Sequence, residues 1–137
     1  MGSMQLLLIV LGAIIIGIAV LVALGAFSHS VAENNLDRVT EYLMELGVRA
    51  QKYYQMPAWL SGGGHSFIGL TADPAGIEKL TNISANGYGT FSILVAGNTT
   101  EVTLQGVGTE DGDRDGTNCT ATLRVLSNNM IMTIVNR

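Results

Sequence analysis

Residues 6–27 read LLLIVLGAIIIGIAVLVALGAF, a run without a charged residue or a proline. As an α-helix with a rise of about 1.5 Å per residue, this run spans about 33 Å, which matches the hydrocarbon thickness of a bilayer. A cleaved secretory signal is the alternative, but its apolar core has only about 7–15 residues and follows a basic start. The residues before Leu6 include no lysine or arginine. We therefore predict a helix that crosses a membrane.

The charged residues of the chain are unevenly distributed. Of the 137 residues, 47% are apolar and 13% are charged, and the formal net charge is −4. All seven basic and all eleven acidic residues lie between Glu33 and Arg137. The length allows one small domain beside the apolar run, which excludes a multidomain enzyme. Scattered basic residues in an acidic chain do not form the cationic face that nucleic-acid binding requires. The single cysteine excludes an internal disulfide.

An amphipathic pattern follows the apolar run. From residue 32, apolar residues recur at spacings of three and four, which is typical of a helix with one buried face. The stripe comprises Ala32, Leu36, Val39, Leu43, Leu46, Ala50 and Tyr53. Charged residues occupy the opposite face, where Glu45 and Arg49 form a favourable i,i+4 pair. No proline separates the stripe from the apolar run, so we predict one helix of about 50 residues that ends before Pro57.

The C-terminal half is rich in glycine and in β-branched residues. Five short runs have strand-like composition. They are residues 66–70, 90–96, 101–107, 121–126 and 130–135. Turn residues at 97–98 and 127–129 favour hairpins, and Pro74 favours one short helical turn. An antiparallel meander needs a covered face, and the amphipathic stripe is the available cover. The predicted fold is α+β, with one long helix packed against a small sheet.

These patterns divide the chain into two parts. Residues 1–30 form the apolar helix, and residues 31–137 form a globular head. Within the head we predict an amphipathic helix at 31–56, a glycine-rich loop at 57–65 and an antiparallel sheet at 66–137. The three glycines at 62–64 lack the lysine of a phosphate-binding loop, so we interpret them as a link. Four aromatic residues near the helix are expected to pack in the core or at an interface. They are Tyr42, Tyr53, Tyr54 and Trp59.

One acidic turn has a spacing associated with calcium. Asp111, Asp113 and Asp115 alternate and are followed by Gly116, which is the order that opens an EF-hand loop. Thr122 stands where that loop supplies its bidentate glutamate, which excludes a full EF-hand. Two interpretations remain, a calcium-stabilised turn of another type and an exposed hairpin tip. If the turn binds calcium, that ion is the one cofactor we expect; otherwise we expect none.

Three further sites carry a modification signal. Asn82, Asn98 and Asn118 each open an Asn-X-Ser/Thr sequence, so they are candidate glycosylation sites on surface turns. Catalytic groupings are scarce by comparison. His29 and His65 are separated by the predicted helix, and the carboxylates gather in one turn rather than around a pocket. We therefore expect a protein that is not an enzyme.

The order of segments resembles that of type IV pilins and their pilin-like relatives. The similarity rests on MQLLLIVLGAIIIGIA at residues 4–19, on AQKYY at 50–54, and on a glycine-rich sheet carried by the same helix. This resemblance implies a structural subunit that waits in the cytoplasmic membrane and then polymerises with itself into an extracellular pilus-like filament. It also implies an assembly machinery, a prepilin peptidase and methylation of the mature N-terminus. Gln5 stands where the family usually carries a glutamate.

The resemblance places the filament core on the apolar helix. The residues expected there are Gln5, Leu8, Leu11, Gly12, Ile15, Ile16, Gly17, Leu21 and Leu24. Two alternative functions remain open. One is a single-pass membrane-anchored binding module that does not polymerise, and the other is a pseudopilin of a secretion system.

Overall fold

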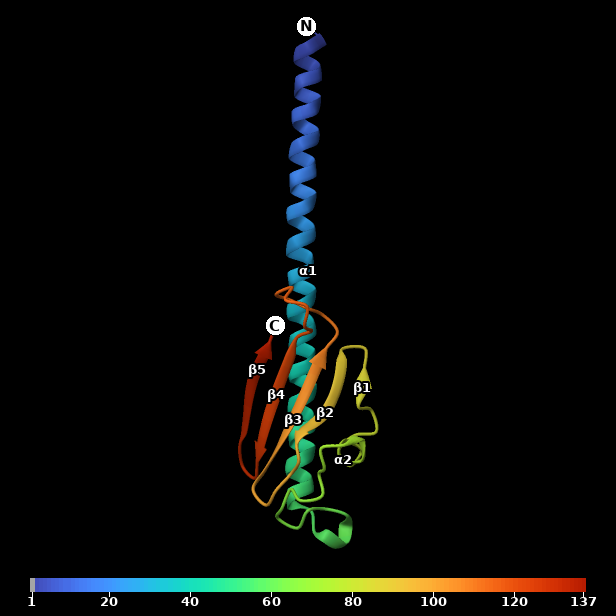
Figure 1. Ribbon diagram of the computed structural model, residues 1–137, viewed down its shortest axis with the longest axis vertical. Coiled ribbons are helices and arrows are strands. Elements are labelled where there is room, and N and C mark those ends of the chain that lie inside the picture. Colours follow the sequence, from blue (N-terminus) through green and yellow to red (C-terminus); the bar gives the residue numbers. More distant parts are fainter. Residues whose placement is uncertain (1) are drawn as a thin grey trace.

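The computed structural model describes residues 2–137 and consists of one long helix with a small sheet packed against its C-terminal half (Figure 1). Helix α1 runs from Gly2 to Gln55. The elements that follow are η1 (Ala58–Leu60), α2 (Pro74–Glu78), β1 (Ala85–Asn86), β2 (Gly89–Val95), β3 (Glu101–Gly108), β4 (Thr120–Leu126) and β5 (Met130–Asn136). The predicted α+β fold is confirmed.

Helix α1 joins the apolar and amphipathic patterns in one continuous element, as predicted. It ends at Gln55, two residues before Pro57, whose ring disfavours helical geometry in the preceding residue. The polar face carries the predicted pair, in which Arg49 Nη2 lies 2.6 Å from Glu45 Oε1. These exposed ions add only a few tenths of a kcal/mol to helix stability. Tertiary packing must therefore supply most of the stability of the second half of α1.

The sheet is a five-stranded antiparallel meander with the order β1-β2-β3-β4-β5. Its register aligns the inward-facing residues of neighbouring strands. Leu104 on β3 lies opposite Ile93 on β2 and Leu123 on β4. Alternate residues of β3 are buried, as expected for a strand with one covered face. The inner face of the sheet is therefore a continuous apolar surface.

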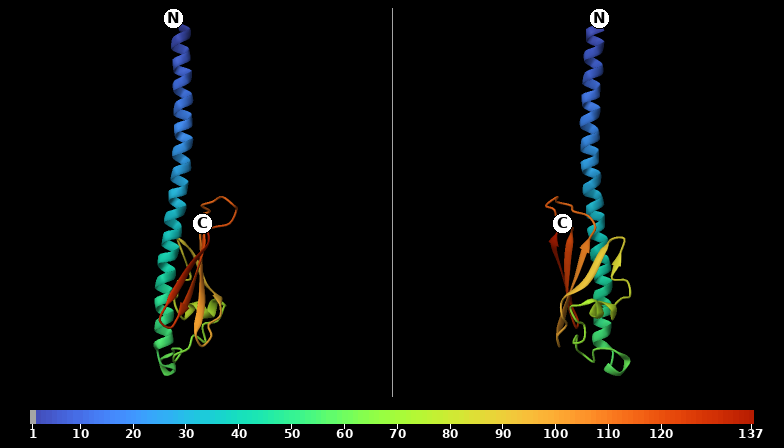
Figure 2. Two further views of the ribbon diagram at one scale, coloured as in Figure 1. Left: turned by 90° about the vertical axis from the view of Figure 1, so that its left-hand side faces the viewer. Right: turned by 45° about the vertical axis from the view of Figure 1, so that its right-hand side comes forward.

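This inner face packs on one side of α1 (Figure 2). Four stripe residues of the helix, Val39, Leu43, Leu46 and Ala50, are fully buried. Two glycines allow the close approach of helix and sheet. A Cβ atom on Gly106 would lie 2.7 Å from Cγ1 of Val39, and one on Gly47 would lie 2.6 Å from Cδ2 of Leu123. The helix and the sheet are therefore close enough at these two positions that only glycine fits.

The predicted strand at residues 66–70 is wrong, and the sheet begins at Ala85 rather than at residue 66. Phe67 and Leu70 are both fully buried, a spacing of three that a strand with only one covered face does not produce. Gly69, with a φ of 106°, turns the chain between them. Backbone bonds then fasten this segment beside the β2–β3 turn, from Phe67 N to Asn98 O and from Gly97 N to Leu70 O. The segment is a buried loop.

The predicted turns are present. Asp73 caps α2, because its Oδ1 accepts a bond of 2.9 Å from Gly76 N. The Thr71 hydroxyl donates a hydrogen bond to the same carboxylate and is the main cause that lowers the pKa of Asp73. The hydrogen bond from the Gly76 amide is the second cause. The β4–β5 hairpin closes at residues 127–129, where Leu126 N donates to Asn129 O over 2.8 Å. These turns could therefore be predicted from the residue types at their positions.

The four aromatic residues separate into two groups. Tyr42, Tyr53 and Tyr54 are partly buried against the core, and the ring of Tyr42 lies 4.5 Å from that of Phe91. Trp59, in η1, is 81% exposed. The packing expected for the three tyrosines is thus found within the chain, whereas Trp59 does not pack in the core.

Because the core has no room at Gly106, we expect Gly106→Ala to destabilise a head fragment that begins at Ser30 by about 1–3 kcal/mol. Its Cβ would press on Val39 and on the ring of Phe91 at 3.0 Å. Gly87→Ala is the matched control, since no atom lies within 4 Å of its Cβ position. Urea denaturation measures both free energies of unfolding. Equal stability of the two variants would contradict this account of helix–sheet packing.

Candidate functional site

The first half of α1 extends away from the head and contacts none of the sheet (Figure 1). Its apolar side chains are widely exposed, with Leu8 at 63%, Ile15 at 58% and Leu21 at 71%. The most apolar window of the helix has a mean hydropathy of 3.3 and is 0% buried. By length and composition this helix can cross a membrane.

The nine expected filament-core residues all lie on this extended part of α1. The structure does not gather them on one face, because successive residues of an α-helix are rotated by about 100°. Gly12 and Gly17 have no atom within 4 Å of their Cβ positions, so the head uses neither of them. A helix that is apolar on every side is stable only where apolar groups surround it. This segment is the main candidate functional surface.

Asn35 fastens the helix to the head close to the point where the head begins. It is 8% exposed and lies within the apolar stripe, where sequence periodicity did not single it out. Its Nδ2 donates to Tyr88 O over 2.8 Å and to Thr109 Oγ1 over 3.1 Å. Its Oδ1 accepts from Thr109 N over 3.0 Å and from Cys119 Sγ over 3.1 Å. One amide thus joins α1 to the loops before β2 and after β3.

Replacing this amide should loosen the upper end of the head. We expect Asn35→Ala to lower the free energy of unfolding by about 1–3 kcal/mol, because it leaves the Thr109 N–H and the Tyr88 carbonyl without their partner. The neighbouring Asn34 is exposed, so Asn34→Ala is the control and should change stability by less than about 0.5 kcal/mol. Thermal unfolding followed by circular dichroism would show the difference. A neutral Asn35→Ala would contradict an anchoring role.

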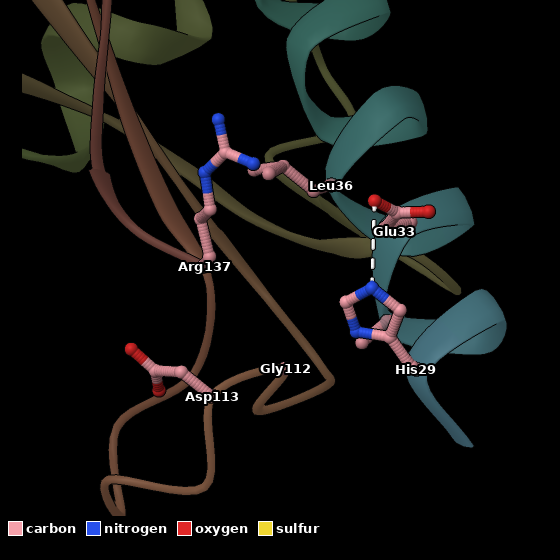
Figure 3. Close-up of a pocket in the computed structure, with 7 residues that line it drawn as sticks. His29, Glu33, Leu36, Gly112, Asp113 and Arg137 are labelled. Carbon is pink, nitrogen blue, oxygen red and sulfur yellow. Dashed lines mark ion pairs between the residues drawn. The ribbon is translucent and has the colours of Figure 1, made fainter. Parts of the chain in front are cut away.

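A hollow of about 130 Å³, here called the neck hollow, lies between α1 and the loop that follows β3 (Figure 3). Ala32 and Leu36 supply apolar lining from the helix, and Gly112 and Arg137 lie on the other side. The loop and the C-terminal end are joined by backbone bonds of 3.1 Å and 3.2 Å from Gly112 N and Asp113 N to Arg137 O. The sequence contained no sign of this hollow, because its walls come from distant segments.

Ionic groups surround the neck hollow. His29 Nε2 lies 3.6 Å from Glu33 Oε1 on the same helix, and Asp113 lies across from them (Figure 3). Arg114 reaches over from the acidic turn and donates to Ser28 Oγ over 3.0 Å. The loop after β3 is therefore attached to α1 where the apolar segment leaves the head.

The acidic turn brings its three carboxylates together. Ligand oxygens of Asp111, Asp113 and Asp115 lie within 4.8 Å of one another. Desolvation is the main cause that raises the pKa of Asp113. The negative charges of Asp115 and Asp111 also raise it. Bonds from the Thr117 hydroxyl and amide lower the pKa of Asp115. The carboxylates also accept backbone bonds within the turn, such as 2.8 Å from Gly116 N to Asp111 Oδ2. Both predicted interpretations, a calcium turn and a hairpin tip, agree with this geometry.

Calcium provides the discriminating measurement. If the three carboxylates hold Ca²⁺, millimolar calcium should raise the melting temperature of the head relative to a chelator, because a ligand that binds only the folded state stabilises it. The shift should disappear in Asp115→Asn, which removes one anionic ligand, and should be smaller with magnesium. A melting temperature that is the same with calcium and with chelator would leave the hairpin-tip interpretation.

The three candidate glycosylation sites lie on the surface. Asn82, Asn98 and Asn118 are all exposed. Two of them have structural roles in turns. Asn98 Oδ1 accepts from Thr100 N and Glu101 N over 2.8 Å and 2.9 Å, and Asn118 Nδ2 donates to Gly108 O over 3.0 Å. A sugar on Asn98 or Asn118 would therefore have to preserve these turn bonds, and Asn82 is the site at which glycosylation would disturb the turns least.

Comparisons of the chain with protein-family models, with curated proteins and with solved structures found no match. The functional proposal accordingly rests on the residues of this chain and on their geometry.

Proposed function

We propose that this protein is a structural subunit that polymerises through its N-terminal apolar helix into an extracellular pilus-like filament. The observation that carries the proposal is the extended part of α1, residues 2–27, which is apolar on all sides and whose most apolar window is 0% buried. In this proposal the subunit is held in the cytoplasmic membrane before assembly. An assembly machinery and a prepilin peptidase act on it, and other copies replace the lipid afterwards.

The energetics of the apolar segment support two successive environments. Burial of a leucine-sized side chain contributes about 1.5–3 kcal/mol, so a segment with many such residues cannot remain in water. Lipid and neighbouring apolar helices both remove it from water. The core of the head uses no residue of α1 before Ala32, so a change of partner for the apolar segment leaves that core intact.

The exposed face of the second half of α1 favours polymerisation over a membrane anchor alone. Met44 and Val48 are 51% and 56% exposed although they are apolar. Met44 lies about 25 Å beyond Phe27 along the helix, which is outside the bilayer that the apolar segment would occupy. A monomeric anchored module leaves these side chains in water. Neighbouring helices in a filament would cover them, as they would in the short polymer of a pseudopilin.

A charge in the middle of the apolar segment tests the proposal. We expect Ile15→Asp to abolish filaments, because a carboxylate has no partner among packed apolar helices and is expensive to bury. Ile15→Leu keeps the apolar volume and should retain them. Electron microscopy of material sheared from the cell surface, with the protein identified as its main component, provides the measurement.

Two controls make the result specific. Far-ultraviolet circular dichroism of the full-length variants in detergent should show the same helix and sheet content as the wild type, because Ile15 is 58% exposed and lies outside the head. Ordinary filaments from Ile15→Asp would contradict a helical filament core. Recovery of the wild-type protein only from membranes, never as filaments, would favour the anchored module.

A further inference from the structure

The end of the head farthest from the apolar segment presents an exposed tryptophan. Helix α1 ends there, and the chain turns through η1, where Trp59 is 81% and Leu60 is 48% exposed. Exposed tryptophans are uncommon in proteins and frequent at the centres of interfaces. We call residues 56–64 the distal tip, and in Figure 1 they form the turn at the lower end of the molecule.

The distal tip is held in place by backbone bonds rather than by side-chain burial. Gly63 N donates to Tyr53 O over 2.7 Å, and Gly64 N donates to Met56 O over 2.9 Å. A Cβ on Gly62 would collide with the carbonyl oxygen of Met56, so this path of the chain requires glycine. The backbone of the tip is therefore already ordered before binding. As a result, binding of Trp59 to a partner costs little backbone entropy.

The opposite end of the head has a cavity of matching character. The neck hollow contains about 130 Å³ and has apolar walls from Ala32 and Leu36. An enclosed protein cavity of about 150 Å³ holds a benzene molecule, so the neck hollow, which is smaller but open to solvent, has room for one edge of an indole ring rather than for the whole ring. The carboxylate of Glu33 stands beside it, whereas that of Asp113 points away toward the acidic turn (Figure 3). The Glu33 carboxylate is an acceptor for the N–H of an indole ring, which is a donor only.

We propose that the distal tip of one copy docks into the neck hollow of the next copy, with Trp59 entering between α1 and the loop that follows β3. This inference rests on the proposed filament and names its axial contact. The two surfaces are different parts of the chain, so the interface is heterologous and repeats without closing, as an open polymer requires. Residues 56–64 carry no charged side chain, so they bring no like charge toward Glu33 and Asp113.

One displacement satisfies this contact and the helix contacts together. Because α1 ends at Gln55 and Trp59 lies beyond that end, placing Trp59 level with Ala32 of the next copy shifts two parallel copies by at least about 23 residues of helix, or about 35 Å along α1. Such a shift brings Met44 and Val48 level with the part of the apolar segment around Leu21 of the next copy. The exposed apolar side chains in the head portion of α1 then lie beside the apolar segment that needs covering.

Disulfide cross-linking of assembled filaments tests the contact. In the full-length chain, Trp59→Cys combined with Asp113→Cys should give a ladder of covalent dimers, trimers and larger species on oxidation. A disulfide forms only when the two Cα atoms lie within about 7 Å. Each single variant should give no ladder, since the native Cys119 is fully buried. Trp59→Cys with Glu33→Cys is a second pair, independent of the conformation of the loop.

A matched pair distinguishes docking from random collision. Ser92 is exposed and faces away from the core on β2, so Trp59→Cys with Ser92→Cys should give no ladder. Filaments that assemble but show no ladder with either neck pair would overturn the docking while leaving the proposed function in place. A cross-link to a different protein would overturn it equally. Absence of filaments from the wild-type chain would overturn the proposed function, and the docking with it.

Substitution of Trp59 provides a readout that does not depend on cysteine. Trp59→Ala should make filaments dissociate at a lower temperature than the wild type, whereas Trp59→Phe, which keeps an aromatic ring, should restore most of the difference. Tyr88→Ala removes another exposed aromatic residue and is the control. The melting temperature of the dispersed head should be the same for both Trp59 variants. Unchanged dissociation of Trp59→Ala filaments would contradict the docking.

Discussion

The contact between the apolar stripe of α1 and the inner face of the sheet is the constraint on which the rest of the structure depends. Leu43 and Leu46 are buried against strands whose register places Leu104 beside Leu123. Neither element is stable alone, because a helix in water depends on tertiary packing and a meander needs one covered face. Gly47 and Gly106 set how closely the two layers approach.

On α1 this contact reaches no farther toward the N-terminus than Ala32, whereas the helix itself continues to Gly2. A continuous α1 therefore connects a folded head to an apolar segment that the head cannot cover. Rigidity of the connection has a functional consequence, because the position of one end of a straight helix determines the position of the other. In the proposed filament, packing of the apolar segments and docking between heads are two effects of a single displacement.

Much of the fold was predictable because its patterns are local. The stripe from Ala32 to Tyr53 and the alternation of residues 90–95 predicted the helix and strand β2, and Pro74 predicted α2. Residues 66–70 misled because apolar content alone does not distinguish a strand from a buried turn. The deciding feature is Gly69, whose positive φ places Phe67 and Leu70 on the same side. Asn35 was missed because a polar residue in an apolar stripe signals anchoring only when its partners are known.

The amino-acid sequence by itself determined the apolar segment, its continuity with an amphipathic helix, the α+β class and the acidic turn. Each of these depends on residues close together in the chain, through helical or strand periodicity and turn preference. Only the tertiary structure decided that Trp59 is exposed at one end of the head and that a hollow lies at the other. The walls of that hollow come from residues about 80–100 positions apart, and such proximity follows from packing rather than from local sequence.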